Sequence, residues 1–382
     1  MIDTKNNGTK EQNFFYMLLL MVQPLIIIAL VLNNEILERA LSYLIYASAL
    51  AIFLMRFSKN EIKKADCFLL GFLLFFVLKI VLFREGKTSL ISFISFFIML
   101  IAYGAGDDIK ETERIKKTIM FSYVVQAIIF CALSLSDYSY KSYVENSDVA
   151  DALTLGIANP NQTGIMLFVN IVVLLWGSKN IKTKFVKALL FVLCVWLFIL
   201  LLFTKARTSI FAFIFVMLFY WLFANKEKLD HSKYGLFKAF IIALVPLVFL
   251  IVYLNIFKIE FFRNIEILGK KLISGRENVY INALNSWHNI LFGDIAFFSF
   301  NNAHNAYLSI LVNIGVIGFL LFFIFIINEI YKKAFCNHKR SSIVYWAFIS
   351  TFLIACSESA LLIGGSIYFV MLFTLCFLLN KE

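Results

Sequence analysis

The stretch "KFVKALLFVLCVWLFILLLF", residues 184–203, decides the fold class. Its two lysines lie in the first turn, and every other residue is apolar or aromatic. A helix of about 20 such residues is long enough to cross a hydrocarbon core of about 30 Å. Similar apolar runs recur along the whole chain, which is typical of a protein that crosses a membrane many times.

The composition supports the same interpretation. Hydrophobic residues make up 61% of the 382 residues and charged residues only 15%, and the mean hydropathy is +0.85. Soluble domains do not have this composition. We expect one all-α polytopic membrane domain over residues 1–382, with about twelve transmembrane helices and one long extracytoplasmic loop, 258–303, that contains short helices. The predicted spans are roughly 14–33, 38–57, 66–83, 88–106, 117–136, 155–177, 184–203, 207–224, 237–257, 304–327, 343–357 and 359–379. No A-x-A-like cleavage site follows the first span, so we expect it to be retained.

The distribution of lysine and arginine predicts the orientation. With the N-terminus in the cytoplasm, the cytoplasmic segments hold 23 of these residues and the outer segments 11. Cytoplasmic loops of membrane proteins carry such an excess of cations. We therefore expect a multi-pass protein of the cytoplasmic membrane with both termini inside and the 258–303 loop outside. The net charge of +11 is mostly a signal of topology. It does not indicate a nucleic-acid partner, which would need a basic face with aromatic or polar readers.

Several kinds of site are not predicted. The six cysteines include no C-x-x-C pair, and the four histidines are far apart. We expect neither a metal nor a structural disulfide. A phosphate-binding Walker A loop and a Rossmann glycine pattern are both missing from the sequence, so we expect no cofactor and no hydrolysis of ATP by the chain itself.

The first unusual outer feature is "TKARTS", residues 204–209, between two predicted spans. Lys205 and Arg207 lie where the apolar chain meets the outer headgroups. Long cations often snorkel at helix ends. Arg207, however, is near the start of its helix, where the helix dipole disfavours a cation. Snorkelling and anion binding both remain open from these residues alone.

The second feature is "LISGRENVYINALNSWHNILFGD", in the long loop. Ser274 and Glu277 form an S-x-x-E capping box, so we expect a helix from about Gly275 to Trp287. Arg276 and Tyr280 would then share one face. The planar fork of an arginine suits phosphate oxygens. The alternative is an ion pair between Arg276 and an acid of the same loop; the candidates are Glu260, Glu266 and Asp294.

The third feature is "GIANPNQTGIML", residues 156–167. Asn159 is a good N-cap residue, and Pro160 suits the first helical position. The amides of Asn161 and Gln162 would then lie at the outer end of the helix. They would bind either sugar hydroxyls or neighbouring helices, and the second is the more common use.

The fourth feature is "AHNAYLSILVNIGVIG", residues 303–318. His304, Leu308, Leu311, Gly315 and Gly318 form one stripe of a continuous helix. Glycines mark a face that packs closely on a neighbour, so we expect His304 to point into the bundle. An inward histidine is most often structural. At a helix N-terminus, however, the dipole favours the neutral imidazole, which can act as a general base. Asn305 would orient it or cap the helix.

These motifs resemble the O-antigen polymerase and O-antigen ligase superfamily of bacterial envelope enzymes. The matches are "NPNQTG" at 159–164, "KARTSIFAF" at 205–213, "SGR" with "LFGD" at 274–276 and 291–294, and "HNAYLSILVNIGVIG" at 304–318. They occur in the family's order and cover about the C-terminal 60% of the chain. Two departures are visible: "NILFGDI" lacks the family's proline and second glycine, and Ala206 stands where a serine is frequent.

The resemblance implies a C-type glycosyltransferase fold and a metal-independent, inverting reaction. The donor would be a glycan on polyprenyl pyrophosphate. Arg207 and Arg276 would hold the pyrophosphate, and His304 would take the proton from the acceptor hydroxyl. Glu358, in "CSESAL", falls where relatives often carry an acid, although an interhelical hydrogen bond would explain it as well. The residues that we expect to bind substrate are Lys205, Asn159, Asn161, Gln162, Asn305, Tyr280 and Glu358.

The function we expect first is a polysaccharide polymerase, which transfers a growing glycan to an incoming lipid-linked repeat unit. A ligase, which moves finished glycan to another acceptor, shares the same motifs. A lysine-rich composition with 44 phenylalanines is associated with AT-rich genomes, whose hosts often make capsules, and favours the polymerase. A lipid-linked oligosaccharide flippase is the third alternative, but it should carry polar residues or broken helices near the membrane midplane. The expected partners are the lipid-linked oligosaccharide and membrane lipid, with a chain-length regulator and a flippase as further candidates.

Overall fold

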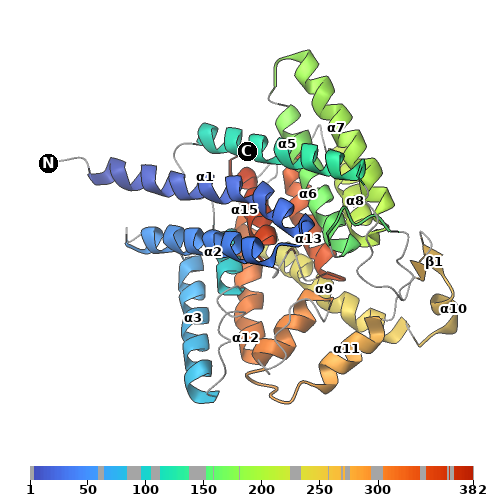
Figure 1. Cartoon of the computed structure of the whole chain (residues 1–382). Coiled ribbons are helices and arrows are strands. Elements are labelled where there is room, and N and C mark those ends of the chain that lie inside the picture. The colour runs from blue at the N-terminus through green and yellow to red at the C-terminus, as the bar shows by residue number, and fades with distance from the viewer. Residues whose placement is uncertain are drawn as a thin grey trace.

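A computed structural model of the chain shows a helical protein with one short hairpin (Figure 1). It describes residues 4–58, 64–83, 96–104, 112–136, 152–157, 159–179, 181–223, 234–256, 258–267, 270–271, 276–293, 304–335, 341–358, 361 and 365–381. The long helices are α1 (Thr4–Val31), α2 (Glu35–Ser58), α3 (Lys64–Phe83), α5 (Thr112–Ser134), α6 (Pro160–Ser178), α7 (Lys184–Phe203), α8 (Arg207–Phe223), α9 (Gly235–Ile256), α12 (Ala306–Ile330), α13 (Ile343–Ala355) and α15 (Ser366–Asn380). Residues 96–103 are also helical. The shorter elements are α10 (Glu260–Arg263), α11 (Arg276–Asn285), the π-helical turn Tyr331–Phe335, and the strands β1 (Glu266–Ile267) and β2 (Lys270–Lys271), which pair antiparallel.

The described helices confirm an all-α membrane protein. Seven of them are long and apolar enough to cross a bilayer, and four shorter apolar helices accompany them. Each of the twelve predicted spans contains a described helix, although only residues 96–103 represent the fourth. The number twelve stays a prediction, because length and apolarity alone do not show that every helix crosses.

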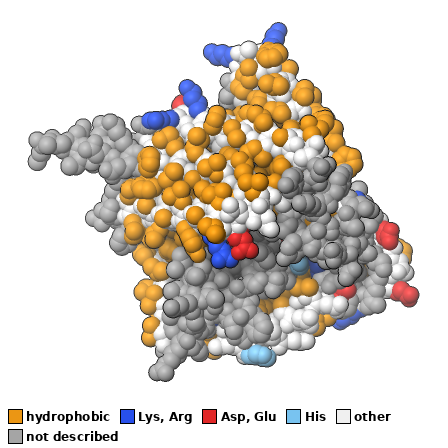
Figure 2. Space-filling view, in the orientation of Figure 1, with side chains coloured by type: hydrophobic (Ala, Val, Ile, Leu, Met, Phe, Trp, Pro, Cys, Tyr) orange, Lys and Arg blue, Asp and Glu red, His pale blue; other side chains and the backbone are white. Residues whose placement is uncertain are grey.

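The outer surface of the bundle is apolar where lipid would contact it. Large side chains stand out from the helices; Phe185 of α7 is 76% exposed and Leu74 of α3 is 63% exposed. Hydrophobic side chains cover much of the described part of the face seen in Figure 2; lysines and arginines stand out at its upper edge, and a group of basic and acidic side chains lies near its middle. Soluble monomers rarely expose apolar patches larger than a few hundred Å².

Three helix starts and one helix end meet at one end of the bundle. Helices α6, α8 and α12 begin there, and α13 ends there, since polar side chains at these termini contact one another. Gly164 of α6 allows the close approach to α8, because a Cβ at Gly164 would lie 2.4 Å from the Cβ of Ala206. Ala206 therefore lies directly against α6.

The tenth predicted span differs from the structure in two ways. The helix begins at Ala306, so His304 precedes it, and the chain is not helical at Gly315, where φ is 67° and ψ is −175°. The stripe from His304 to Gly318 on one continuous helix is therefore wrong. The stripe assumed regular helical periodicity from residue 304 to residue 318. Because the helix is interrupted at Gly315, residues before and after it do not share one helical face.

Candidate functional site

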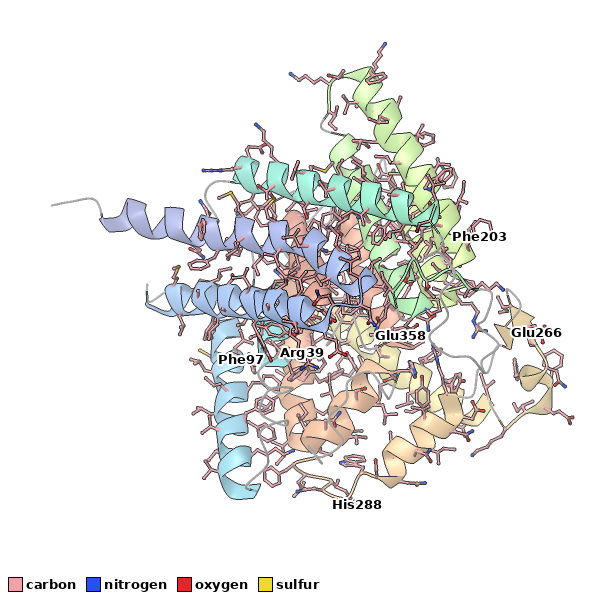
Figure 3. All side chains as sticks on the ribbon, in the orientation of Figure 1. Arg39, Phe97, Phe203, Glu266, His288 and Glu358 are labelled. Carbon is pink, nitrogen blue, oxygen red and sulfur yellow. The ribbon has the colours of Figure 1, made fainter. Side chains whose placement is uncertain are left out.

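The carboxylate of Glu358 is the centre of a polar cluster at this end of the bundle. One oxygen, Oε1, accepts hydrogen bonds from Arg276 Nη2 at 2.7 Å and from Asn161 Nδ2 at 2.8 Å. The other oxygen, Oε2, lies 3.7 Å from His304 Nδ1. Figure 3 shows Glu358 toward the middle of the molecule, whereas Glu266 and His288 lie at its edge. Four segments far apart in the sequence thus meet at one side chain.

This cluster gives Arg276 an ion-pair partner outside its own loop. Its ion-pair partner is Glu358 rather than Glu260 or Glu266 of its own loop; Asp294 and the predicted capping residue Ser274 lie outside the described residues. The Glu358 side chain is only 8% exposed and that of Arg276 is 18% exposed. Partly buried charge-assisted hydrogen bonds of this kind are short and directional. The pair fixes the guanidinium over the ends of α6 and α13.

His304 lies just before α12 in an unusual backbone conformation. Its φ is +49°, in the left-handed region that non-glycine residues seldom adopt. The imidazole is 30% exposed, and its Nδ1 faces the Glu358 carboxylate at a distance too long for a hydrogen bond. The stripe predicted that helix periodicity would point His304 into the bundle. Instead, His304 lies in the turn before α12, and the conformation of this turn places its imidazole next to Glu358.

Asn305 is the N-cap of α12, and its side chain holds three elements together. Its Oδ1 accepts from Leu308 N at 2.9 Å, while its Nδ2 donates to Pro246 O and to Cys356 O. The residue is fully buried. The sequence placed it among the substrate-binding residues, but these contacts place it behind the site, where it fixes His304 against α9 and α13.

Arg207 enters the same site from the first turn of α8. The neighbouring Thr208 hydroxyl makes a short hydrogen bond with the Ser357 hydroxyl, which ties the start of α8 to the residue before Glu358. Arg207 is half-buried, and Arg276 acts on it electrostatically as a like charge. Two guanidinium groups therefore share one neighbourhood. Guanidinium groups placed together are suited to binding phosphate oxygens.

The polar start of α6 is partly structural. Asn159 is the N-cap predicted from the sequence, with its side chain accepting from Asn161 N, and Pro160 is the first helical residue. The Asn161 amide bonds across to Glu358, which agrees with the interhelical use of these amides. Gln162 is half-buried next to it. Lys205 lies in the turn before α8 with a φ of +52°, and it is half-buried as well.

Tyr280 is buried close to Arg276 and Glu358, which both act on it electrostatically. It is fully buried in a cluster with Leu250 of α9 and with Leu308 and Val312 of α12. Burial raises the pKa of its hydroxyl, which makes no hydrogen bond within the described residues. The expected shared face of α11 is present, but Tyr280 anchors the helix and does not reach solution.

The central position of Glu358 in the cluster was not predicted from the sequence. A signal for it was present, because the predicted topology places this acid between spans 11 and 12 on the same side as the two arginines. The contacts of Thr208, Ser357 and Pro246 were not predicted either, because they depend on how the helices pack. Among the described residues, no group of three His, Cys, Asp or Glu side chains lies together as metal ligands.

The arrangement combines groups suited to two tasks. The guanidinium group of an arginine carries five N–H donors in a fixed planar arrangement, which suits it to binding phosphate oxygens. An imidazole beside a carboxylate is suited to take a proton from a hydroxyl. Comparison with known protein families, characterised proteins and solved structures finds no match to this chain.

Proposed function

We propose that the chain is a polysaccharide polymerase of the cytoplasmic membrane. It transfers a growing glycan from polyprenyl pyrophosphate to a hydroxyl of an incoming lipid-linked repeat unit, on the outer face of the membrane. The observation that carries the proposal is the convergence of Arg276, Asn161 and His304 on Glu358, with Arg207 beside them. The C-type glycosyltransferase fold and the inverting, metal-independent course belong to the same proposal and rest on the motif resemblance.

Each site residue has a distinct role in this reaction. His304 removes the proton from the acceptor hydroxyl as that oxygen attacks the anomeric carbon. The bond from that carbon to the pyrophosphate oxygen breaks on the opposite face, and Arg207 and Arg276 stabilise the leaving pyrophosphate. Glu358 orients Arg276 through Oε1 and faces His304 Nδ1 through Oε2. The departing pyrophosphate supplies the free energy, so the reaction needs no ATP.

The test uses the purified full chain in lipid with a defined polyprenyl-pyrophosphate repeat unit. Wild type should lengthen the glycan. We expect His304→Ala to lose about 10²- to 10⁴-fold in rate, the range for removal of a general base. We expect Arg207→Ala and Arg276→Ala each to lose about 10²-fold or more, as for other groups that stabilise developing charge.

Matched controls are available within the chain. His288 is exposed in the loop after α11, and Arg39 is an exposed arginine paired with Glu35. His288→Ala and Arg39→Ala should retain activity. Full-length polymer from His304→Ala would remove the base assignment, and near-normal activity of Arg276→Lys would argue against bidentate phosphate binding.

The ligase alternative has the same site chemistry and a different acceptor. Glycans extracted from cells that lack the protein separate the two. Loss of long chains, with single repeats still attached to their final acceptor, indicates a polymerase. Lipid-linked polymer that accumulates and is never attached indicates a ligase.

One observation favours a transporter, namely the interruption of α12 at Gly315 with the buried Lys79 of α3 beside it. Broken helices and charges at membrane depth occur in transport proteins. A vesicle assay with fluorescent lipid-linked oligosaccharide distinguishes this function. Movement across the bilayer without a new glycosidic bond would support transport and would count against the polymerase.

A further inference from the structure

The interruption of α12 is built jointly with the loop 289–293. Beyond Gly315, Val316 N donates to Ile290 O at 2.9 Å and Ile317 N donates to Leu291 O at 3.1 Å. In a continuous helix these amides would bond the carbonyls of residues 312 and 313. The loop therefore replaces the missing turn of the helix. Backbone that is not helical is tolerated at membrane depth only where protein satisfies it in this way.

Lys79 of α3 satisfies the other side of the interruption. Its Nζ donates to Gly293 O at 3.1 Å, to Asn313 O at 3.0 Å, and to Phe292 O through a short hydrogen bond. The side chain is 1% exposed. An ammonium has three donors, and each finds a carbonyl here. Asn313 O is one of the carbonyls that the broken helix leaves unbonded, and the end of the first half-helix also carries partial negative charge.

The loop fits this place closely. A Cβ on Gly293 would lie 2.4 Å from the backbone of Asn313, and a Cβ on Gly315 would lie 2.3 Å from Leu291 O. Both glycines have positive φ. The Phe292 ring stacks on Phe75, which is also on α3. Helix α3 thus holds the loop by a ring contact and by a buried charge.

The same loop leads directly back to the functional site. It follows α11, which carries Arg276 at its first position. Trp287 Nε1 donates to Asn289 O at 3.1 Å, and Asn289 Oδ1 accepts from Phe292 N at 3.1 Å, so the chain between α11 and Gly293 is a compact turn. Figure 3 marks His288 in this turn. Anchoring the turn on α3 therefore restricts where α11 can lie over α12.

We propose that Lys79 is a positioning residue for Arg276. It locks the 289–293 loop into the interruption of α12, and the loop holds α11 where the Arg276 guanidinium meets Glu358. This inference rests on the proposed function for its effect on catalysis, but its structural part stands independently. Lys79 acts in this proposal through the loop and not through a contact with substrate.

The structural part is tested by the distance between two spin labels on the full chain with its native cysteines replaced. One label is placed at Asn282 on α11 and the other at Tyr43 on α2, and both positions are exposed. Lys79→Met, which keeps the length and apolar stem but not the charge, should broaden and shift the distance distribution. The matched control, Leu78→Met, alters a neighbouring residue that is 58% exposed and should leave the distribution unchanged. An unchanged distribution in Lys79→Met overturns the inference, whatever the activity.

The catalytic part is tested by kinetics. Lys79→Met should lower kcat by about 100-fold, the cost of a displacement of about 1 Å at a reacting centre. In an Arg276→Lys background the same change should cost far less, because the two substitutions disable one contact. If the loss in kcat of the double variant equals the product of the losses of the two single variants, Lys79 does not act through Arg276. If wild type fails to polymerise, the proposed function fails, and the spin-label distances still decide the role of Lys79.

A second variant covers the case in which Lys79→Met does not fold. Asn289→Ala removes the bond to Phe292 N and leaves the buried ammonium in place. It should also broaden the distances from α11. A distribution as narrow as that of wild type would show that the loop does not fix α11, and would overturn the proposal.

Discussion

At the scale of single residues, Asn159 and Asn305 are both N-caps but use their amides differently. The side chain of Asn159 accepts a hydrogen bond from Asn161 N. Asn305 accepts from Leu308 N and also donates to Pro246 O and Cys356 O. An aspartate accepts as well as an asparagine but donates nothing when ionised. The two positions are therefore a matched pair for separating capping from interhelical bonding.

Asn159→Asp should be tolerated, and Asn305→Asp should not. A cap contributes about 1 kcal/mol, and both substitutions preserve it. At Asn305, however, the new carboxylate would be buried against two carbonyl oxygens. Burying an unpaired charge in this way should lower the free energy of unfolding by several kcal/mol. Thermal unfolding in detergent measures both variants. Equal melting temperatures would show that the Asn305 donors contribute nothing.

Tyr280 offers a second comparison at this scale. Its ring is buried in the cluster with Leu250 and Leu308, and its hydroxyl makes no hydrogen bond within the described residues. Tyr280→Phe should therefore retain activity and should not lower stability, because it removes a buried hydroxyl that makes no hydrogen bond within the described residues. Tyr280→Ala should cost about 3 kcal/mol through the cavity it leaves. A large loss of activity in Tyr280→Phe, without loss of stability, would return Tyr280 to the substrate-binding residues.

The residues predictable from sequence were those whose roles are local. The Asn159 cap and Pro160 follow from the sequence of a helix start, and the structure confirms them. The central place of Glu358 was not predictable in the same way. Its partner Arg276 is 82 residues away and Asn161 is 197 residues away. Only the packed helices reveal which of several acids each cation meets.

At the scale of elements, the two glycines of the interruption make a specific prediction. Gly315→Ala should unfold or inactivate the protein, because the added Cβ would meet the backbone oxygen of Leu291 and the backbone has positive φ. Gly71 of α3 is the matched control, since a Cβ there meets nothing within 4 Å. Gly71→Ala should be neutral or stabilising by up to about 1 kcal/mol.

Yield and melting temperature after purification measure both glycine variants. A Gly315→Ala protein as stable as Gly71→Ala would show that α12 can run through residue 315 as a continuous helix. That result would also remove the structural basis for the role of Lys79.

The helices themselves were predictable, but the interruption was not. Runs of apolar residues mark helices because each must hide its backbone polar groups within itself in lipid. Gly315 and Gly318 fit both a close-packed continuous helix and a broken one. The choice between them depends on the carbonyls of Ile290 and Leu291, which lie outside the helix and bond the amides of Val316 and Ile317.

At the scale of the whole molecule, the charge distribution predicts which side each helix end faces. Asn34, between α1 and α2, should lie outside, and Lys182, before α7, should lie inside. Both positions are exposed. In a cysteine-free background, a membrane-impermeant maleimide added to intact cells should label Asn34→Cys but not Lys182→Cys. Permeabilised cells should label both. The reverse pattern in intact cells would invert the topology and move the site to the cytoplasm.

The whole-molecule prediction was correct at the level of class. Composition identified a helical membrane protein, and each predicted span contains a described helix. The number of spans and the side of each loop remain predictions, since both depend on the bilayer. Position in the membrane follows from lipid contact, which helix packing by itself does not define.

The dependence of the site on Glu358 has a consequence for synthesis of the protein. Ribosomes make the chain from the N-terminus, and helices enter the membrane in that order. Arg207, Arg276 and His304 are all in place before α13 emerges, but the carboxylate that receives Arg276 and faces His304 follows α13. Until then Arg276 has no contact with the Glu358 carboxylate. On the proposed function, transfer should therefore begin only after α13 and Glu358 have emerged, and no shorter nascent chain should carry out transfer.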